Sequence, residues 1–526
     1  PVPVEDITAQ WQVCSPDTVA GFTAVGYYMG RTLQQELDVP VGLIHSSWGG
    51  TRIEPWTPIV GFERVEALSD LHGRVLTRSP GTSQHRQLLQ KHIDATQNWA
   101  EQATAALAAG KTSGPSPAWP SELAPLKDRQ DPTALYNAMI HGLVGFPIRG
   151  AIWYQGESNH TEGMQYYEKM KALINGWREI WQQGEFPFYY VQIAPFQYGN
   201  EDPAILAELW EAQAAALELP KTGMAVINDI ATLKDIHPPN KQDVGYRLAL
   251  LALKQDYGRD DLVARSPELD SLDVLDGQLK LTFRHTGGGL KTRDGKAPTH
   301  FEIVGPDSNG FQPAEARIDR DSVILSSANV KSPTAFRFAW HKLAEPNLTG
   351  GSGLPVGAVR GGEVPSFVQT IPELQQYQLV YDLNLSRLGP GKVEWTTNNS
   401  RDISAFDRVG YLLELSSGRT SQSLFVAMDA FTDNVRHIGV PTAGSKATFR
   451  QPVENLSVYS NVDGIVTGES LGTGSIEFWP NNYGPGNSKS VPGASSDLYD
   501  WGDEPSGPAN GYGSMQLHNP GAEQTL

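Results

Sequence analysis

The sequence predicts an α/β domain built on a parallel sheet, followed by two mainly antiparallel β domains. Between Leu135 and Asp256, strand-like and helix-like segments alternate, which is typical of a parallel sheet covered by helices. Beyond Asp256 the helical periodicity fades, and the 53 glycines and 37 prolines of the 526-residue chain indicate many turns. We therefore expect three domains, at residues 1–255, 256–371 and 372–526.

The predicted first domain begins with a helix and a strand. Residues Ala24–Leu37 have an amphipathic pattern, and Val39–Ile44 form an apolar run. Between residues 61 and 126 the character changes, because Gln87–Ala109 predict a long polar helix and Gly110–Pro117 a loop. We interpret residues 61–126 as a helical insertion near the mouth of the site. It could be a lid, but a surface elaboration is the simpler interpretation.

The rest of the first domain supplies alternating strands and helices. We predict strands at Ile152–Tyr154, Phe186–Ala194 and Met224–Ile230, and helices over Tyr166–Trp181 and from Asn240 onward. The strands are short and apolar, and the helices repeat apolar residues at helical spacing. The first and last of these strands run into polar loops. In an open α/β sheet, ligands bind at such loops.

Short strand patterns predominate after Asp256. In the second domain they lie at 278–283, 300–304, 314–318, 322–325 and 335–340. In the third domain they lie at 379–385, 393–396, 409–415, 423–428, 447–449, 456–459 and 475–479. Short strands at this turn spacing favour a β-sandwich or jelly roll for the third domain.

Two features of the third domain could bind a ligand. The stretch Phe478–Asn487 mixes aromatic and amide residues, as sugar-binding surfaces do, and Asp497, Asp500 and Asp503 could hold Ca²⁺. We favour a structural interpretation for both: Trp479 caps the core of the domain, and the aspartates stabilise turns.

The composition excludes several classes of protein. A net charge of −18 argues against nucleic acid or an anionic membrane as a partner. No apolar run approaches the roughly 20 residues that span a bilayer. Cys14 is the single cysteine, which excludes an internal disulfide, and no Cys/His cluster offers a zinc site. We expect no metal and no organic cofactor, and the sequence does not determine the oligomeric state.

The loop after the strand Ile152–Tyr154 is the most informative part of the chain. It presents Gln155, Glu157 and Asn159 together, and Gly156 allows a sharp turn. A carboxylate and an amide at one strand end can orient a histidine and bind an oxyanion. An ordinary solvated turn is the alternative interpretation of this loop taken alone.

Two further loops make a catalytic interpretation stronger. Gly49 and Gly50 follow the first apolar run and leave backbone N–H groups open to a ligand oxygen. After Met224–Ile230, His237 precedes a predicted helix and Asp235 lies two residues before it. Together the three loops offer the parts of a serine-esterase site.

These loops lie in segments that resemble the sialate O-acetylesterase family of the SGNH-hydrolase superfamily. The resemblance spans Trp11 to about Leu253 and rests on WQVCSPDTVAGFTAVGYYMGRTLQQELDVPVGLIHSSWGGTRIEPW, LYNAMIHGLVGFPIRGAIWYQGESN, YYEKMKALINGWREIW, FPFYYVQIAPF and DIHPPNKQDVGYRLALLAL. It implies a three-layer, flavodoxin-like esterase domain that removes acetyl groups from sugar hydroxyls by a Ser–His–acid mechanism. It also implies export to the periplasm or the extracellular space, although no signal peptide is visible.

The resemblance assigns roles to the residues of the three loops. His237 is the predicted general base. The N–H of Gly49 or Gly50 and the side-chain amide of Asn159 match the superfamily's second and third blocks, and so form the predicted oxyanion hole.

The acid that orients His237 has two candidates. The superfamily usually places an aspartate three residues before the histidine, where this chain has Lys234. Asp235 is near in sequence, but some related acetylesterases use the glutamate of a Gln-Gly-Glu turn, which is Glu157 here. We favour Glu157, because Asp235 is suited to stabilising its own loop.

The nucleophile motif of the family is absent from this sequence. Family members carry the serine in a Gly-Gln-Ser-Asn-Met type motif, upstream of the segment that starts here at Trp11. Ser15, Ser46, Ser47 and Ser158 have no such context. We therefore expect an N-terminally truncated enzyme that is inactive in this form. The alternative is a non-catalytic carbohydrate-binding protein on an esterase scaffold.

Four residues are candidates for contact with an acetylated sugar: Arg52, Trp48, Trp56 and Gln155. Arg52 could pair with a sugar carboxylate. It could equally form an internal ion pair with Glu54 or Glu157.

Overall fold

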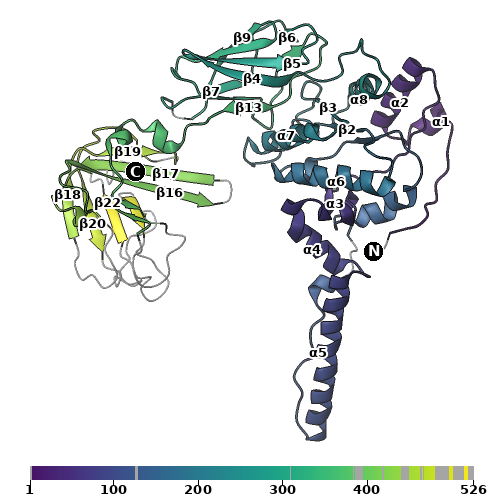
Figure 1. Cartoon of the computed structure of the whole chain (residues 1–526), viewed down its shortest axis with the longest axis horizontal. Coiled ribbons are helices and arrows are strands. Elements are labelled where there is room, and N and C mark those ends of the chain that lie inside the picture. Colours follow the sequence, from purple (N-terminus) through teal and green to yellow (C-terminus); the bar gives the residue numbers. More distant parts are fainter. Residues whose placement is uncertain are drawn as a thin grey trace. The chain divides into compact units, whose positions relative to one another are not determined.

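The computed structural model divides the chain into two units (Figure 1). The first contains residues 1–305 and 310–363, and the second contains residues 306–309 and 364–526. The separation of the first unit into two domains stays a prediction. The structure describes residues 3–124, 128–308, 310–382, 384, 395–417, 420–439, 449–462, 465, 467–479, 497–501 and 514–518.

A parallel sheet lies inside the first unit. Its strand order is β1 (Ala151–Trp153), β2 (Phe188–Val191) and β3 (Thr222–Ala225), and both neighbouring pairs run parallel. Strand β2 is buried along its whole length, as expected for a strand that is covered on both faces. The predicted combination of α/β structure with a parallel sheet is confirmed.

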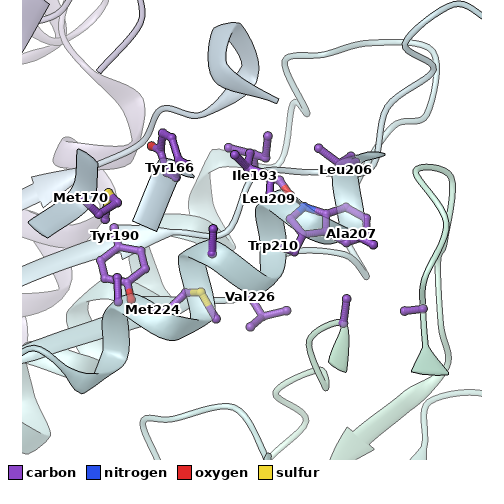
Figure 2. Close-up of a cluster of buried hydrophobic side chains, with 14 of the residues drawn as sticks. Tyr166, Met170, Tyr190, Ile193, Leu206, Ala207, Leu209, Trp210, Met224 and Val226 are labelled. Atoms are coloured by element: carbon purple, nitrogen blue, oxygen red, sulfur yellow. Dashed lines mark hydrogen bonds between the residues drawn. The ribbon is translucent and has the colours of Figure 1, made fainter. Parts of the chain in front are cut away.

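Helices cover the two faces of this sheet with separate buried clusters. Successive residues of a strand point to opposite faces. Phe188 and Tyr190 accordingly belong to the cluster with helices α6 and α7, which Figure 2 shows in part, whereas Tyr189 and Val191 belong to the cluster with α2 and α8. The helices are α2 (Ala24–Leu37), α6 (Gln165–Trp181), α7 (Ile205–Ala215) and α8 (Lys241–Asp256).

The starts of two helices follow from their capping residues. Thr23 accepts a hydrogen bond from the N–H of Gly26 at the start of α2, and Asn240 accepts one from the N–H of Asp243 at the start of α8. Such caps satisfy N–H groups that have no partner within the helix. Both helices begin where the sequence predicts them.

The strand predicted at Val39–Ile44 does not join the sheet. The segment has no strand assignment, and among the described residues β1 pairs only with β2. Its side chains pack on α2 instead: a Cβ added at Gly30 would lie 2.8 Å from Cδ1 of Leu43. A β-strand requires a hydrogen-bonded neighbour, and the described part of the chain offers none here.

The predicted insertion contains the long helix α5 (Ser83–Ala108), which projects from the first unit in Figure 1. Thr82 caps its first turn, and none of its residues is buried. The chain that follows packs back along it, since the indole N–H of Trp99 donates to the carbonyl oxygen of Gly114 at 2.8 Å and Trp119 contacts His92 edge to face.

The remainder of the first unit consists of antiparallel sheets that share a buried cluster with α6 and α7. One sheet has the order β4 (Glu268–Leu275), β5 (Gln278–Arg284), β10 (Ser322–Ser326), β9 (Glu315–Asp319). Another has the order β13 (Val359–Gly362), β11 (Ala335–Phe338), β7 (Phe301–Val304), β8 (Gln312–Pro313), and β12 (Leu348–Gly350) pairs with β6 (Leu290–Thr292). The five strand patterns predicted here all correspond to strands.

The second unit is also antiparallel. Its described sheets have the orders β14 (Tyr381–Asp382), β15 (Thr397–Asn398); β16 (Arg408–Ser417), β17 (Thr420–Asp429), β19 (Ser457–Ser460); and β18 (Phe449–Val453), β20 (Gly474–Trp479), β22 (Ser514–His518), β21 (Asp497–Trp501). The jelly roll stays a prediction. Residues 480–487 of the aromatic and amide loop, and Asp503 of the calcium hypothesis, lie outside the described residues. In the described part of the chain, every helix is too short or too polar to cross a bilayer.

Candidate functional site

The turn after β1 requires a glycine at position 156. A Cβ atom there would lie 2.9 Å from Cγ2 of Ile193 and 3.3 Å from Cδ2 of Leu209, two side chains of the buried cluster in Figure 2. The turn is therefore pressed against the core, and the short 3-10 helix η6 (Glu157–Asn159) follows at once. This arrangement holds Glu157 and Asn159 at the carboxyl end of the parallel sheet.

Asn159 is the centre of a buried hydrogen-bond network. Its side chain has 0% exposure. Its Oδ1 accepts bonds from the N–H of Ile53 at 3.0 Å and from Nε2 of Gln155 at 2.8 Å, and its Nδ2 donates to Oε2 of Glu54 at 3.1 Å. One N–H of the amide is therefore bonded to Glu54, and the amide is buried. The oxyanion role of Asn159 stays a prediction.

Gln155 connects this network to the loop that contains the paired glycines. Its Nε2 also donates to the carbonyl oxygen of Thr51 at 3.0 Å, and its Oε1 accepts a bond from the hydroxyl of Tyr166 at 2.9 Å. Both ends of the amide are occupied by protein groups. Gln155 therefore braces the loop, which differs from the predicted contact with a sugar.

Gly49 and Gly50 form an open turn. Gly50 has a φ of 72°, in the left-handed region that favours glycine. A Cβ added at either glycine would meet no heavy atom within 4 Å, so there is room for a ligand beside the turn. Gln130 clamps it from another loop, with Nε2 donating to the carbonyl oxygen of Gly50 at 2.6 Å and Oε1 accepting the N–H of Arg52 at 2.9 Å.

Glu157 is a half-buried carboxylate at the start of η6. Its Oε2 accepts a bond from the N–H of Gly156 at 3.0 Å. Burial raises the pKa of Glu157 above its usual value, although backbone hydrogen bonds and the nearby charges of His237 and Lys241 act in the opposite direction. The pairing of Glu157 with His237 stays a prediction.

His237 lies in a solvent-exposed loop. Its side chain is 83% exposed, and its Nδ1 lies 3.8 Å from Oδ1 of Asp235, beyond hydrogen-bond distance. The same Oδ1 accepts the backbone N–H of His237 at 2.9 Å. Asp235 therefore stabilises the backbone of its own loop and does not hold the imidazole ring in this structure.

Trp56, another candidate for sugar contact, is buried and its indole N–H donates to Oγ1 of Thr51 at 3.0 Å. Trp48 and Arg52 lie beside the open turn. Trp48 is 49% exposed, and the guanidinium of Arg129 lies 6.0 Å from the centre of its ring. Arg52 is half exposed and its Nη1 lies 3.5 Å from Oε1 of Glu162. The internal partner of Arg52 is thus Glu162, whereas the sequence had suggested Glu54 or Glu157.

The structure also shows two arrangements that sequence reasoning missed. Ser47 Oγ lies 2.7 Å from Nε2 of His45, and burial lowers the pKa of His45. In addition, Lys169 is buried, and its Nζ lies 2.6 Å from Oε1 of Glu54. One signal was available, because Lys169 falls within the apolar pattern of the helix Tyr166–Trp181.

Comparisons with known proteins show which family the chain is similar to. Residues 118–253 match the family described as carbohydrate esterase, sialic acid-specific acetylesterase. The chain is 31% identical over 272 residues to a sialate O-acetylesterase of Rattus norvegicus, which covers 48% of this chain and 46% of the relative. The corresponding human protein is 30% identical over 281 residues, covering 50% and 45%. The chain thus spans about half the length of these two relatives.

A solved structure covers more of the molecule. The crystal structure of a carbohydrate acetylesterase from Xanthomonas citri is 33% identical, matches 68% of this chain and 70% of that chain, and has a TM-score of 0.54. Both the sequence family and this structure point to carbohydrate esterases. The chain belongs to the sialic acid-specific acetylesterase family of carbohydrate esterases.

Proposed function

We propose that this chain is a carbohydrate O-acetylesterase of the sialate O-acetylesterase type. The observation that carries the proposal is that hydrogen bonds tie the loop after Gly49 and Gly50 to Gln155 and Asn159 at the end of β1, next to the half-buried Glu157. The names of the relatives from rat and Xanthomonas citri support the same reaction. We extend the proposal to an SGNH, flavodoxin-like fold for the α/β domain and to an exported protein.

The proposed reaction is the hydrolysis of an acetyl ester. A serine hydroxyl attacks the acetyl carbonyl, and His237 takes the hydroxyl proton and returns it to the leaving sugar oxygen. Water then cleaves the acetyl-serine by the same proton transfers and releases acetate. The chemistry moves only protons and an acyl group, so it needs no metal and no organic cofactor.

The other residues have supporting roles in this proposal. Backbone N–H groups of Gly49 and Gly50 bind the oxyanion, a type of contact worth about 3–4 kcal/mol per donor. Glu157 stabilises the charged imidazole once the exposed loop of His237 closes over it, with Asp235 as the competing partner. Trp48 offers an exposed face on which a sugar can stack, and Arg52 can exchange Glu162 for a sugar carboxylate.

We propose that the catalytic serine is not among the serines of this sequence. Ser46 Oγ is buried without a hydrogen-bond partner, and Ser15 Oγ is 3.3 Å from the hydroxyl of Thr18. Ser47 is the competitor, because its Oγ lies 2.7 Å from Nε2 of His45.

The test is acetate release from p-nitrophenyl acetate and from O-acetylated sialic acid. We expect no appreciable turnover by the 526-residue chain, and turnover by a version that includes the coding sequence upstream of Pro1. His237→Ala should abolish that turnover, since loss of a triad member costs up to about a millionfold in rate. Turnover by the 526-residue chain that is lost in Ser47→Ala would refute the assignment of the nucleophile.

The second candidate function is carbohydrate binding without catalysis. The exposed ring of Trp48 favours it, because such a ring can hold a sugar without any nucleophile. An upstream-extended protein that binds O-acetylated sugar in calorimetry, loses this binding in Trp48→Ala and shows no turnover would favour this second function.

A further inference from the structure

Lys169 is a buried lysine that pairs with Glu54, the residue directly after the loop of residues 49–53. Lys169 is 5% exposed, although it belongs to the face of α6 that otherwise carries apolar residues. Its Nζ donates to Oε1 of Glu54 at 2.6 Å and to Oε2 of Glu162 at 2.7 Å. Burial of an ammonium group is unfavourable unless carboxylates compensate for the lost water, and here two of them do.

Glu54 connects Lys169 to Asn159, because its carboxylate accepts hydrogen bonds from both side chains. Burial raises the pKa of Glu54, but the charge of Lys169 and the hydrogen bonds from Lys169 and Asn159 outweigh burial and hold the pKa below its usual value. An ionised carboxylate has only acceptors. The NH₂ end of the Asn159 amide must therefore face Glu54, and its Oδ1 must face the N–H of Ile53 and Nε2 of Gln155.

A protonated Glu54 would remove this constraint. Its hydroxyl could donate to Oδ1 of a rotated Asn159, and the NH₂ group would then meet the N–H of Ile53 and the Nε2 group of Gln155. Donors would face donors, so the network would lose bonds that now hold residues 51–53. An ionised Glu54 thus acts together with the N–H of Ile53 and Nε2 of Gln155 to hold the amide of Asn159 in one direction.

The backbone of Glu54 is fixed by an unusual residue. Thr133 has a φ of 67° and 0% exposure, a conformation that is uncommon for a β-branched side chain. Its N–H donates to the carbonyl oxygen of Glu54 at 3.0 Å. Strained residues persist where the surrounding structure determines them. The bond from Thr133 thus helps to fix the backbone position of Glu54.

We propose that Lys169 is a positioning residue for the loop of residues 49–53: it holds the carboxylate of Glu54, Glu54 holds the NH₂ end of the Asn159 amide, and the amide holds the backbone at Ile53. Asn159 thus stabilises the loop that carries Gly49 and Gly50, the proposed oxyanion donors. The value of this role for catalysis depends on the proposed function, but the positioning itself can be measured without any reaction.

The test is hydrogen–deuterium exchange, read by mass spectrometry, on the whole chain. Lys169→Met keeps the length of the side chain and removes its charge. We expect amide exchange in peptides covering residues 49–53 to rise by about tenfold or more, which corresponds to roughly 1.4 kcal/mol of local opening. Lys171→Met is the matched control, because Lys171 lies on the same helix in a partly exposed pair with Glu168, and it should leave exchange in 49–53 unchanged.

A double variant separates positioning from general destabilisation. In Glu54→Gln/Lys169→Met both charges are absent, and the new amide oxygen can accept the bond from Asn159. Exchange in 49–53 should therefore return toward the wild-type rate. If Lys169→Met does not fold, protection of 49–53 in the double variant decides the question by itself.

Two results would overturn the proposal. One is an unchanged exchange rate in 49–53 for Lys169→Met; the other is faster exchange across the whole first unit that the double variant does not restore. In an upstream-extended, active enzyme, Lys169→Met should lower kcat and leave KM within about twofold. Because exchange does not require turnover, failure of the proposed esterase function would leave the exchange result intact.

Discussion

Replacing Tyr166 with phenylalanine removes one hydroxyl group from the support of the site. This hydroxyl donates to both the backbone carbonyl oxygen and Oε1 of Gln155, each at 2.9 Å, and it lies 3.4 Å from the indole nitrogen of Trp153. The side chain is fully buried. Tyr166→Phe keeps the ring and creates no large cavity, so its effect reports on hydrogen bonding.

The expected loss follows from these contacts. A buried polar group left without its partner costs about 1–3 kcal/mol. A single hydroxyl proton is shared by two acceptors on Gln155, and the contact with Trp153 is long. We therefore expect the free energy of unfolding of Tyr166→Phe to fall by about 2 kcal/mol.

The matched control is Tyr190→Phe. Tyr190 is also fully buried, but its hydroxyl makes a single bond, to the carbonyl oxygen of Gln213 at 2.8 Å. Its loss should be about 1 kcal/mol. Urea unfolding followed by tryptophan fluorescence measures both, because Trp153 and Trp210 are buried in the same cluster of the first unit. A loss for Tyr166→Phe no greater than that for Tyr190→Phe would refute this account of how Gln155 is held.

Two further predictions concern charged groups near the sheet. Because burial raises the pKa of Glu157, the folded protein binds a proton there more tightly than the unfolded chain, so its contribution to stability declines as the pH rises above about 4.5. Glu157→Gln should remove that decline from urea midpoints measured between about pH 4 and 8; an unchanged slope would contradict it. Arg247 bonds both oxygens of Asp229 at 2.7 Å in a largely buried pair. Arg247→Met should cost about 3–5 kcal/mol in urea unfolding and Arg247→Lys clearly less, whereas a loss below about 1 kcal/mol for Arg247→Met would show that the pair is screened by solvent.

The sequence predicted the helix at Ala24–Leu37 correctly but was wrong about the strand at Val39–Ile44. The helix at Ala24–Leu37 matches its predicted range, because its apolar stripe and its threonine cap are local properties. The strand at Val39–Ile44 was predicted from the same kind of local pattern and does not form. Strand formation depends on a neighbour that is distant in sequence, and apolar composition cannot supply one.

The same distinction holds for the site. The Gly-Gly turn and the strand-end position of Glu157 follow from residues next to each other in the chain. The hydrogen bonds of Asn159 and Gln155 do not follow from neighbouring residues, because their partners Glu54 and Thr51 lie about a hundred positions away in the sequence. A pattern of residue types can indicate where an amide lies, but its hydrogen bonds determine what it can do.

Within the described residues β1 pairs with a strand on one side only, which has a consequence for handling this protein. Backbone N–H and C=O groups along a free strand edge are a template for any extended chain, and Ile152 in the middle of β1 is 36% exposed. Solution behaviour should therefore depend on protein concentration, with edge-to-edge association starting at this strand. A lysine in place of Ile152 would act as a gatekeeper against such association, while the buried sheet face behind it would be left undisturbed.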